Sequence, residues 1–580
     1  MRQLVFGLVL VFGCSAFAEM APVADRVAKQ DSLFEEYYQA FLKNFPERAT
    51  AFGDYRYNSQ LGQVSLEEIA RQHTENDDFL ARLKAIPTDG MSDKDLLSHR
   101  ILEKQLERGD VNYALKNYEM PVNQQNGVHT QLADLPNAVP FDSVQHYQDY
   151  ISRLHQIPRV LEQTAEVMRQ GEKDHLMPPK IVAGKLPGQC DGIIAANPFL
   201  EPTKKFPLNF SEQDKKRLTD EITKAIKDDV FPAYKKFAEF LRTDYAPKGR
   251  TELAIESLAD GKRRYAEAVK TMTTIAVPPP EVHEIGLKEV ARITDEMTRL
   301  AESQGYKDLA SFREAVNKDP RWKPTSEQQI LDDYKKYIHQ MEPKLPELFG
   351  LLPKSPVTVE PIPDFAKAAA THYVQGTPDG KRPGRVVVAV SNPTKRTLID
   401  DEAVAYHEGV PGHHLQISIA QTLEGLPKFR LHGFFSAYAE GWALYSEVLG
   451  KEIGFYKDPV SDYGRLNSEM LRAVRLVVDT GIHDKNWSRQ QVIDYMHAND
   501  LNDALAQTEA DRYIAWPGQA LAYKMGQLTI LKLRDEAKKQ LGEKFDLKSF
   551  HDEILNGGSM PLDLLQERVE AWITNQKQQL

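Results

Sequence analysis

The run AYHEGVPGHHLQ, residues 405–416, holds the most reactive combination of side chains in the sequence. His407 and Glu408 are adjacent there, two more histidines follow, and Glu440 lies further on in the run FSAYAEGWALYSE. Zinc in proteins takes about four ligands, commonly imidazole and carboxylate, and a catalytic site leaves one position to water. Hydrolysis also needs a carboxylate that takes a proton from that water. The pattern predicts one Zn²⁺ held by His407 and Glu440, with Glu408 as the general base.

The second histidine ligand is ambiguous because the usual His-Glu-x-x-His spacing is broken. Pro411 stands four residues after His407, and a proline inside a helix lacks its N–H and presses on the carbonyl four residues back. Gly412 loosens the same turn. In a straight helix His414 returns to the face of His407, one turn too far along. If two residues are looped out, His413 takes the usual place, and the sequence leaves both ligands open.

Downstream residues supply candidates for the rest of a hydrolytic site. A developing oxyanion needs a hydrogen-bond donor besides the metal. The candidate donors are Tyr513, Tyr523 and His483, since phenol and imidazole donate at neutral pH. Arg512 and Lys524 are candidates to bind a substrate carboxylate.

Two further carboxylates are spaced to meet an imidazole. Glu447 follows Glu440 by seven residues, on the same helix face, and metal-bound imidazoles usually donate their second N–H to such an acceptor. Asp479 and His483 are four residues apart, which predicts a carboxylate–imidazole pair on one helix.

The N-terminus has the pattern of a secretory signal peptide over residues 1–18. One basic residue, Arg2, precedes an apolar run over residues 4–12, and small residues end at Ala18. A lipoprotein-type alternative places cleavage before Cys14, with a lipid anchor on its sulfur. No later run has the length of a membrane span. We expect an exported protein, periplasmic or secreted, with no transmembrane span.

Composition restricts the class further. The formal net charge is −11, and no basic cluster with interleaved aromatic residues appears, so nucleic acid is not an expected partner. The two cysteines are Cys14 and Cys190. Because Cys14 lies in the segment that is removed or lipidated on export, no internal disulfide is expected. A chain of 580 residues must therefore be stabilised by a large core.

Helical periodicity dominates the chain, which predicts a mostly α fold. Amphipathic patterns cover residues 31–42, 66–83, 212–230, 282–302 and 326–341. A further pattern over residues 147–169 contains Pro158, so it predicts two helices or one kinked helix. The proline triplet at residues 278–280 is the best internal boundary. It divides the chain into an N-terminal helical lobe, residues 19–277, and a C-terminal catalytic lobe, residues 278–580.

One clear strand is predicted at residues 385–390, a β-branched run that follows a turn-rich stretch over residues 377–384. It precedes the helix of His407. Two roles are open for it: an exposed edge that pairs with an extended peptide, or a buried strand in a small sheet.

The motif HExxPGHHLQ resembles the signature of the bacterial domain-of-unknown-function family 885. Four other stretches resemble it too: residues 379–384, 475–483, 512–524 and 545–551. The resemblance covers essentially the whole mature chain and implies a large multi-helical, metallopeptidase-like body with a small β-sheet beside the active-site helix. More distantly, the order of the His-Glu helix and a later Ala-Glu440 helix is similar to neurolysin-type oligopeptidases, angiotensin-converting enzyme and carboxypeptidase Taq, in which a Glu on a later helix is the third zinc ligand.

These expectations combine into a zinc-dependent hydrolase that cleaves amide bonds of short peptides. Two alternatives remain. One is a non-catalytic, metal-containing peptide-binding or scaffold lipoprotein, in which four protein ligands close the site. The other is a metal-dependent amidase that acts on cell-wall or acylated amino-acid substrates. No Gly-x-Ser-x-Gly motif of serine hydrolases occurs.

Overall fold

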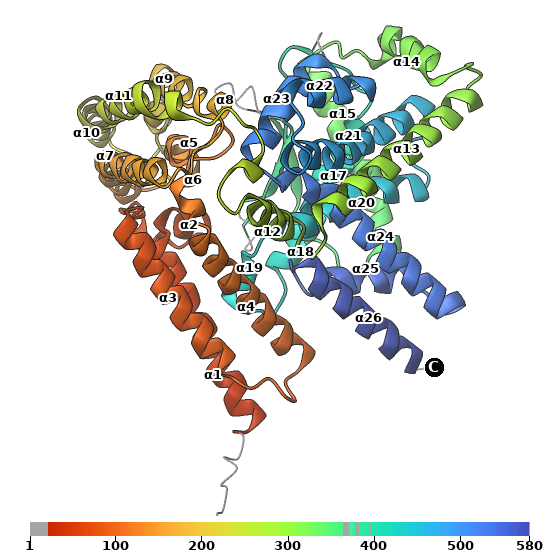
Figure 1. Ribbon diagram of the computed structural model, residues 1–580, viewed down its shortest axis with the longest axis horizontal. Coiled ribbons are helices and arrows are strands. Elements are labelled where there is room, and N and C mark those ends of the chain that lie inside the picture. Colours follow the sequence, from red (N-terminus) through yellow and green to blue (C-terminus); the bar gives the residue numbers. More distant parts are fainter. Residues whose placement is uncertain (1–20, 363–369, 378–381, 394–395, 579–580) are drawn as a thin grey trace, which may run out of the picture.

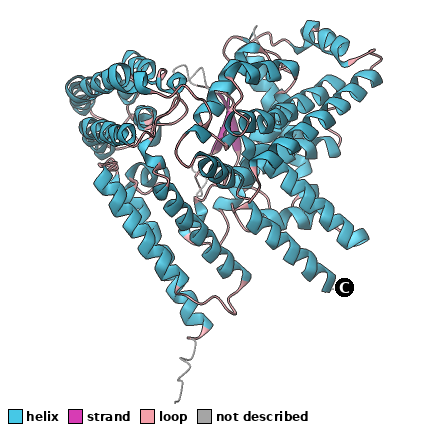
Figure 2. Ribbon diagram, viewed as in Figure 1, coloured by secondary structure: helices cyan, strands magenta, loops and turns pink. Residues whose placement is uncertain are grey.

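The computed structural model of the chain describes residues 21–362, 370–377, 382–393 and 396–578. Helices make up most of it, and a small sheet lies near the centre (Figures 1 and 2). The mostly α fold with a small sheet that the sequence predicts is confirmed. The predicted signal peptide and Cys14 lie outside the described residues.

The N-terminal half forms two groups of helices, seen at the left of Figure 1. The first group runs α1 (Val23–Asn44), α2 (Pro46–Ala51), α3 (Leu66–Lys84) and α4 (Asp93–Ala114). The second group runs α5 (Val128–Ala133), α6 (Leu135–Ala138), α7 (Val144–Lys173), α8 (Lys180–Ala183), α9 (Leu186–Ala196), α10 (Glu212–Ala225) and α11 (Phe231–Phe240).

The C-terminal half carries the candidate site. It begins with α12 (Gly261–Thr273), α13 (Pro279–Ser303), α14 (Leu309–Lys318), α15 (Glu327–Met341) and α16 (Leu345–Leu348). The middle helices are α17 (Asp401–Glu408), α18 (His413–Gln421), α19 (Lys428–Leu431), α20 (Ser436–Glu452) and α21 (Pro459–His483). The last are α22 (Arg489–Ala498), α23 (Asp503–Ala515), α24 (Ala522–Leu541), α25 (Leu547–Leu555) and α26 (Leu562–Gln578).

Local sequence explains where several helices begin. Ser65 and Ser326 each accept a hydrogen bond from the backbone three residues on, so they cap α3 and α15. The proline triplet starts α13. The N–H groups of a first helical turn have no acceptor inside the helix, so prolines, which lack an N–H, lose no hydrogen bond there. Of the two alternatives around Pro158, the structure has a single helix, α7, that continues through the proline.

The sheet has three strands in the order β1 (Val357–Pro361), β3 (Gly384–Val388), β2 (His372–Val374). The central strand β3 pairs in parallel with β1 and antiparallel with β2. It corresponds to the predicted strand, and both of its edges are occupied. Of the two roles left open, β3 therefore has that of a buried strand in a small sheet.

The largest apolar core crosses the proposed lobe boundary. It includes Leu33 and Leu102 of the first helices together with Tyr406, Trp442 and Leu565 of the C-terminal half. A second core is confined to residues 61–246 and holds α7 and α9–α11 together. The first helices therefore pack onto the C-terminal half, while the second helical group has its own core.

Two glycines bring α20 and α24 into close contact. A Cβ added to Gly441 would lie 2.4 Å from the Cα of Gly526, and one added to Gly526 would lie 2.0 Å from the carbonyl oxygen of Ala437. Only glycine leaves room for backbones this near to each other. This crossing fixes α24 against α20, the helix that carries Glu440.

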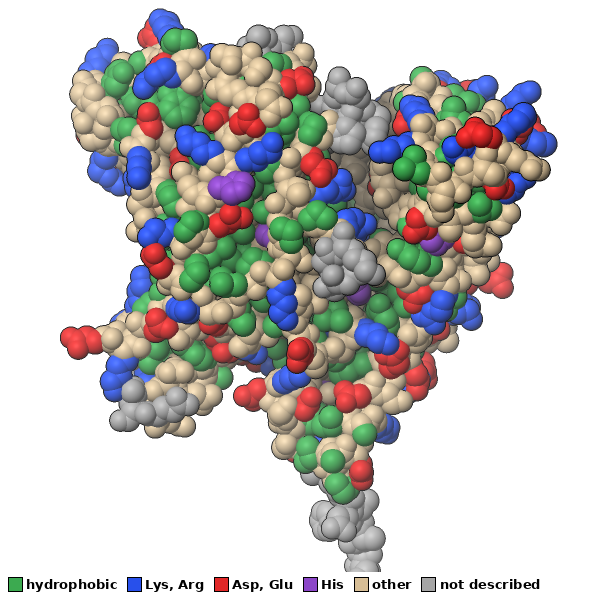
Figure 3. All heavy atoms as spheres, turned by 180° about the vertical axis from the view of Figure 1, so that it is seen from behind, with side chains coloured by type: hydrophobic (Ala, Val, Ile, Leu, Met, Phe, Trp, Pro, Cys, Tyr) green, Lys and Arg blue, Asp and Glu red, His purple; other side chains and the backbone are tan. Residues whose placement is uncertain are grey.

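On the face shown in Figure 3, acidic and basic side chains are interspersed, with no basic stripe of the kind that binds nucleic acid. None of the described helices combines the length and the apolar character that a membrane span requires.

Candidate metal centre

The predicted helix break lies between His407 and His413. Helix α17 ends at Glu408, the Val410–Pro411 peptide bond is cis, and α18 begins at His413. Gly412 fits the turn because a Cβ there would lie 2.0 Å from the carbonyl oxygen of His407. The turn is closed by hydrogen bonds from the N–H of Gly412 to Tyr406 and from that of His414 to Gly409. His413 thus starts a new helix that points back toward α17.

Two imidazoles and a carboxylate converge at this turn. The Oε2 atom of Glu440 lies 3.5 Å from Nε2 of His407 and 3.4 Å from Nε2 of His413. Both distances exceed the range of a normal hydrogen bond, about 2.7–3.2 Å. Atoms bound to one tetrahedral zinc at about 2.0–2.2 Å are roughly 3.3–3.6 Å from one another. The spacing of these donors therefore fits ligands of a shared ion.

Glu408 completes the group from inside α17. Ligand atoms of His407, Glu408 and His413 all lie within 4.8 Å of one another. Exposed fractions of 3%, 8% and 8% make these three residues largely inaccessible to bulk solvent. Burial strengthens electrostatic interactions because the local dielectric is low.

The charges in the group support one another. Burial disfavours a charged His407, but the carboxylates of Glu440 and Glu447 beside its ring raise its pKa to about 9. Burial would likewise raise the pKa of Glu440, but the imidazoles of His407 and His413 hold it well below the usual value. Such a cluster of imidazole and carboxylate donors attracts a cation.

Glu447 lies where the sequence places it, on the face of α20 that carries Glu440. Its Oε1 atom is 2.8 Å from Nδ1 of His407, so the ring donates its Nδ1 proton to the carboxylate. The other ring nitrogen, Nε2, then faces Glu440. Fixing the tautomer in this way is the role that carboxylates have beside metal-bound histidines.

Helix α20 also holds the broken turn in place. The carbonyl of Pro411 accepts hydrogen bonds from the indole Nε1 of Trp442 at 2.9 Å and from Oγ of Ser446 at 3.2 Å. A single helix therefore presents the carboxylate of Glu440, orients His407 through Glu447 and anchors the turn. The sequence analysis did not identify Trp442 and Ser446, whose signal is their helical spacing around Glu440.

His414 turns away from the other donors, which corrects its inclusion among the metal ligands. Its Nε2–H donates to the carbonyl of Ser355 at 3.0 Å, and its Nδ1 accepts from the hydroxyl of Tyr373 at 3.1 Å. Burial lowers the pKa of His414 to about 4. The ring is thus a neutral link between α18 and the sheet, and a Cβ on Gly384 would lie 2.6 Å from its Nδ1.

Two predicted oxyanion donors are already engaged. The fully buried Tyr513 donates its hydroxyl proton to Glu509. The Nε2–H of His483 donates to the carbonyl of Tyr513 at 2.9 Å, and its Nδ1 accepts from the N–H of Ile255 at 3.1 Å. Both assignments as donors to a substrate are therefore wrong, because neither group has a free proton to offer.

The predicted pair of Asp479 and His483 does not form. Asp479 accepts instead from the hydroxyl of Tyr265 at 2.7 Å and from the N–H of Gly518 at 3.0 Å. Burial raises the pKa of Asp479 to about 7. This carboxylate anchors the turn before α24.

Lys524 is wrong as a substrate contact, since its side chain is fully buried among protein partners. Its ammonium group lies 2.6 Å from Glu469, 2.7 Å from Gln527 and 2.9 Å from Glu289. Every donor of the ammonium group is used.

Arg512 and Tyr523 remain partly accessible. Arg512 donates to Gln519 at 2.6 Å and to Glu509 at 3.2 Å, and its contact with the hydroxyl of Tyr523 is longer, 3.4 Å. Tyr523 lies one turn before Gly526, at the close crossing with α20. These two side chains are the predicted substrate contacts that the packing leaves available.

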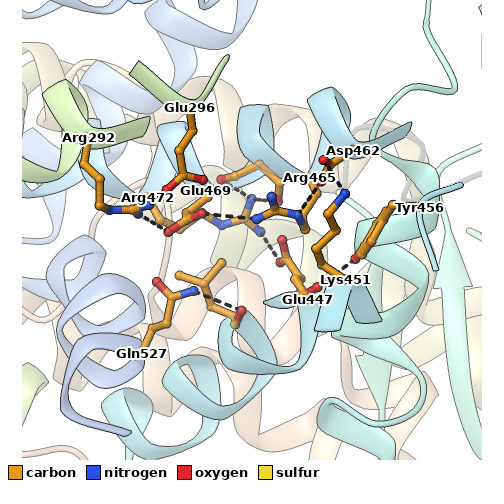
Figure 4. A network of polar contacts seen from close by, with 12 residues as sticks. Arg292, Glu296, Glu447, Lys451, Tyr456, Asp462, Arg465, Glu469, Arg472 and Gln527 are labelled. Atoms are coloured by element: carbon orange, nitrogen blue, oxygen red, sulfur yellow. Dashed lines mark hydrogen bonds and ion pairs between the residues drawn. The ribbon is translucent and has the colours of Figure 1, made fainter. Parts of the chain in front are cut away.

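A network of ion pairs, buried except for the exposed side chain of Lys451, lies behind Glu447 (Figure 4). It joins arginines of α21, among them Arg465 and Arg472, with Asp462, Glu469 and Lys451. The sequence analysis did not single out these arginines. Their signal is the presence of basic residues on a helix that is otherwise largely apolar and buried.

The comparisons with known proteins give a family and two similar structures. The family model described as "Bacterial protein of unknown function (DUF885)" matches residues 46–569. The structure is similar to that of a candidate lipoprotein from Colwellia psychrerythraea, with a TM-score of 0.89 and 30% identity over 95% of this chain and 99% of that one.

A candidate lipoprotein of unknown function from Shewanella oneidensis is 17% identical, with a TM-score of 0.73 over 94% of this chain and 99% of that one, and so shares the fold. Among curated proteins, none matches. The name of the Colwellia protein fits the exported location predicted from the N-terminus. The match over most of the sequence shows that the chain belongs to the DUF885 family.

Proposed function

We propose that this chain is a zinc-dependent hydrolase that cleaves amide bonds of short peptides, with Glu408 as the general base. The observation that carries the proposal is the spacing of Glu440 from His407 and His413, 3.5 and 3.4 Å. These distances are too long for direct hydrogen bonds and match the separation of ligands on one tetrahedral ion. A bound zinc ion would polarise a carbonyl group and lower the pKa of a bound water.

The number of ligands favours a catalytic over a structural site. Structural zinc sites are closed by four protein ligands, and catalytic ones commonly have three. The geometry offers His407, His413 and Glu440, while His414 is engaged by Ser355 and Tyr373. Three ligands leave a position for water, which argues against a closed site in a scaffold lipoprotein.

The side chains around the site can supply the proton transfer, hydrogen bonding and substrate binding that amide hydrolysis requires. Glu408 takes a proton from the attacking water at its carboxylate and passes it to the amide nitrogen that leaves. Tyr523, on the helix that crosses α20, would donate a hydrogen bond to the developing oxyanion. Arg512 beside it can hold a substrate carboxylate.

Metal analysis of the purified mature chain, combined with a panel of amide substrates, tests this function. We expect one equivalent of zinc and turnover of short peptides. Glu408→Gln should keep the metal and lose about 10²–10⁴-fold in turnover, because general bases contribute that much. Glu424→Gln is the matched control, since Glu424 is exposed in a loop and should have no effect.

The outcome of the substrate panel separates the alternatives. Cleavage of N-acyl amino acids or cell-wall fragments in place of peptides would make the protein an amidase of another substrate class. A metal-loaded wild type that hydrolyses no amide in the panel would favour a binding lipoprotein. A protein without bound metal would overturn the proposal.

A further inference from the structure

The guanidinium of Arg472 lies next to the carboxylate that orients His407. Its nearest nitrogen is 4.0 Å from Oε1 of Glu447, the same oxygen that accepts the Nδ1 proton of His407. The Glu447 side chain is 1% exposed and that of Arg472 is 13% exposed. Figure 4 shows Glu447 facing the arginines of α21. A carboxylate as buried as this one needs a nearby positive charge, because water does not solvate it.

The position of Arg472 is itself fixed by its own helix. One terminal nitrogen donates to the carbonyl of Ser468 at 2.9 Å and to its hydroxyl. The charge of Arg472 also acts on Asp400, the residue directly before α17. Burial raises the pKa of Asp400, and the charges of Arg396 and Arg472 oppose that rise. Arg472 therefore lies within electrostatic reach of both the beginning of the metal helix and the partner of its histidine.

We propose that Arg472 is a positioning residue of the metal centre, which neutralises and holds Glu447 and through it fixes the orientation and tautomer of His407. This inference rests on the proposed function for its metal, but the residue acts on the imidazole even when no metal is bound. Arg472 does not touch the substrate. Its effect should appear in metal affinity, since residues behind metal ligands typically change that affinity about 10–100-fold.

The test compares Arg472→Met with Arg472→Lys and with a matched control, Arg465→Met. Arg465 lies on the same helix and is also buried, but it pairs with Asp462 at 2.9 Å and with Glu469 at 3.5 Å. Zinc affinity is measured by competition with a chelator, and stability by thermal unfolding in the presence of excess chelator. We expect Arg472→Met to weaken zinc binding about 10-fold or more. Arg472→Lys should restore part of the loss, and Arg465→Met should lower stability with unchanged affinity.

A second readout works without metal. In the metal-free wild type, the ring ¹⁵N shift of His407 Nδ1, assigned by its loss in His407→Gln, should report a protonated nitrogen hydrogen-bonded to Glu447. In Arg472→Met this shift should report a weakened hydrogen bond. Unchanged zinc affinity and unchanged shifts in Arg472→Met, or an equal loss of affinity in Arg465→Met, would overturn the inference. If the wild type binds no zinc, the proposed function fails, and the ¹⁵N shifts still decide whether Arg472 positions the imidazole.

Discussion

Two groups of histidine and carboxylate side chains in the described part of the chain have the composition of a metal site, and they differ in what surrounds them. The group around His407 is buried and receives Glu440 between two imidazoles. The second group consists of His73, Asp77 and Asp110 on α3 and α4, and its side chains are 24%, 55% and 32% exposed.

The geometry of the two groups differs more than their composition. Asp77 lies 3.6 Å from Nε2 of His73, whereas Asp110 lies 3.8 Å from Nδ1, on the opposite edge of the ring. In these contacts the two carboxylates face different nitrogens of the ring, although ligand atoms of the three residues lie within 4.8 Å of one another. At the buried group, Glu447 occupies one nitrogen of His407 and leaves the other to face Glu440. The comparison teaches that the assignment of each ring nitrogen, rather than residue type alone, makes a site.

The largest difference in zinc binding between the two groups is expected when one histidine is removed from each. We expect His407→Ala to weaken zinc binding by more than about 100-fold, because a ligand contributes more than the residues behind it. His73→Ala should leave the tight site intact. Zinc titration of both variants by chelator competition decides between them. Equal loss in the two variants, or loss in His73→Ala alone, would reverse our choice of site.

A smaller but sharper difference is expected between adjacent histidines. His413→Ala should lose the metal, as His407→Ala does. His414→Ala should change zinc affinity only a few-fold. It should lower the free energy of unfolding by about 1–3 kcal/mol, since the partly buried partners Ser355 and Tyr373 lose their hydrogen bonds. Chemical denaturation and zinc titration measure the two effects, and metal loss in His414→Ala would restore it as a ligand.

Buried histidines that the structure keeps neutral should make the stability of the protein depend on pH. Burial lowers the pKa of His414, His483 and His551 to about 4 in the folded protein. In the unfolded chain these groups titrate near the usual histidine value of about 6.5. The unfolded state therefore binds more protons between these pH values, and stability falls as pH decreases through this window.

Each group contributes up to about 1.4 kcal/mol per pH unit to this decrease. The measurement is the urea midpoint between pH 7 and pH 5. His551→Gln serves as the control, because glutamine can keep hydrogen bonds like those of His551 to Tyr445 and Leu348 but does not titrate. Its midpoint should depend less on pH than that of the wild type, and an equal dependence would contradict the assignment.

The sequence predicts elements that rest on local rules. Helical periodicity predicts α3, α13 and α15 nearly to their ends, because apolar spacing and capping residues act within one turn. The β-branched run predicts β3 for the same reason. Its neighbours were not identified, because β1 has only the short β-branched run over residues 357–359 and β2 has three residues. Which strands pair, and the central place of β3, depend on contacts between distant segments.

Prediction of the site was less complete because hydrogen bonding over long sequence separations decides which polar groups are free. The spacing of Glu440 and Glu447 places both on one face of α20. By contrast, His483 and Tyr513 have suitable chemistry, but Ile255 and Glu509 use their hydrogen-bonding capacity. Lys524 is neutralised by carboxylates more than fifty residues away in the sequence.

The sequence by itself predicted a kink or break in the helix after His407, since Pro411 lacks an N–H and Gly412 loosens the same turn. Only the tertiary structure decided which imidazole the break turns toward Glu440. Trp442 and Ser446 hold the Pro411 carbonyl on α20, while Ser355 and Tyr373 draw His414 to the sheet. These contacts come from distant parts of the chain, and spacing along a single helix carries no information about them.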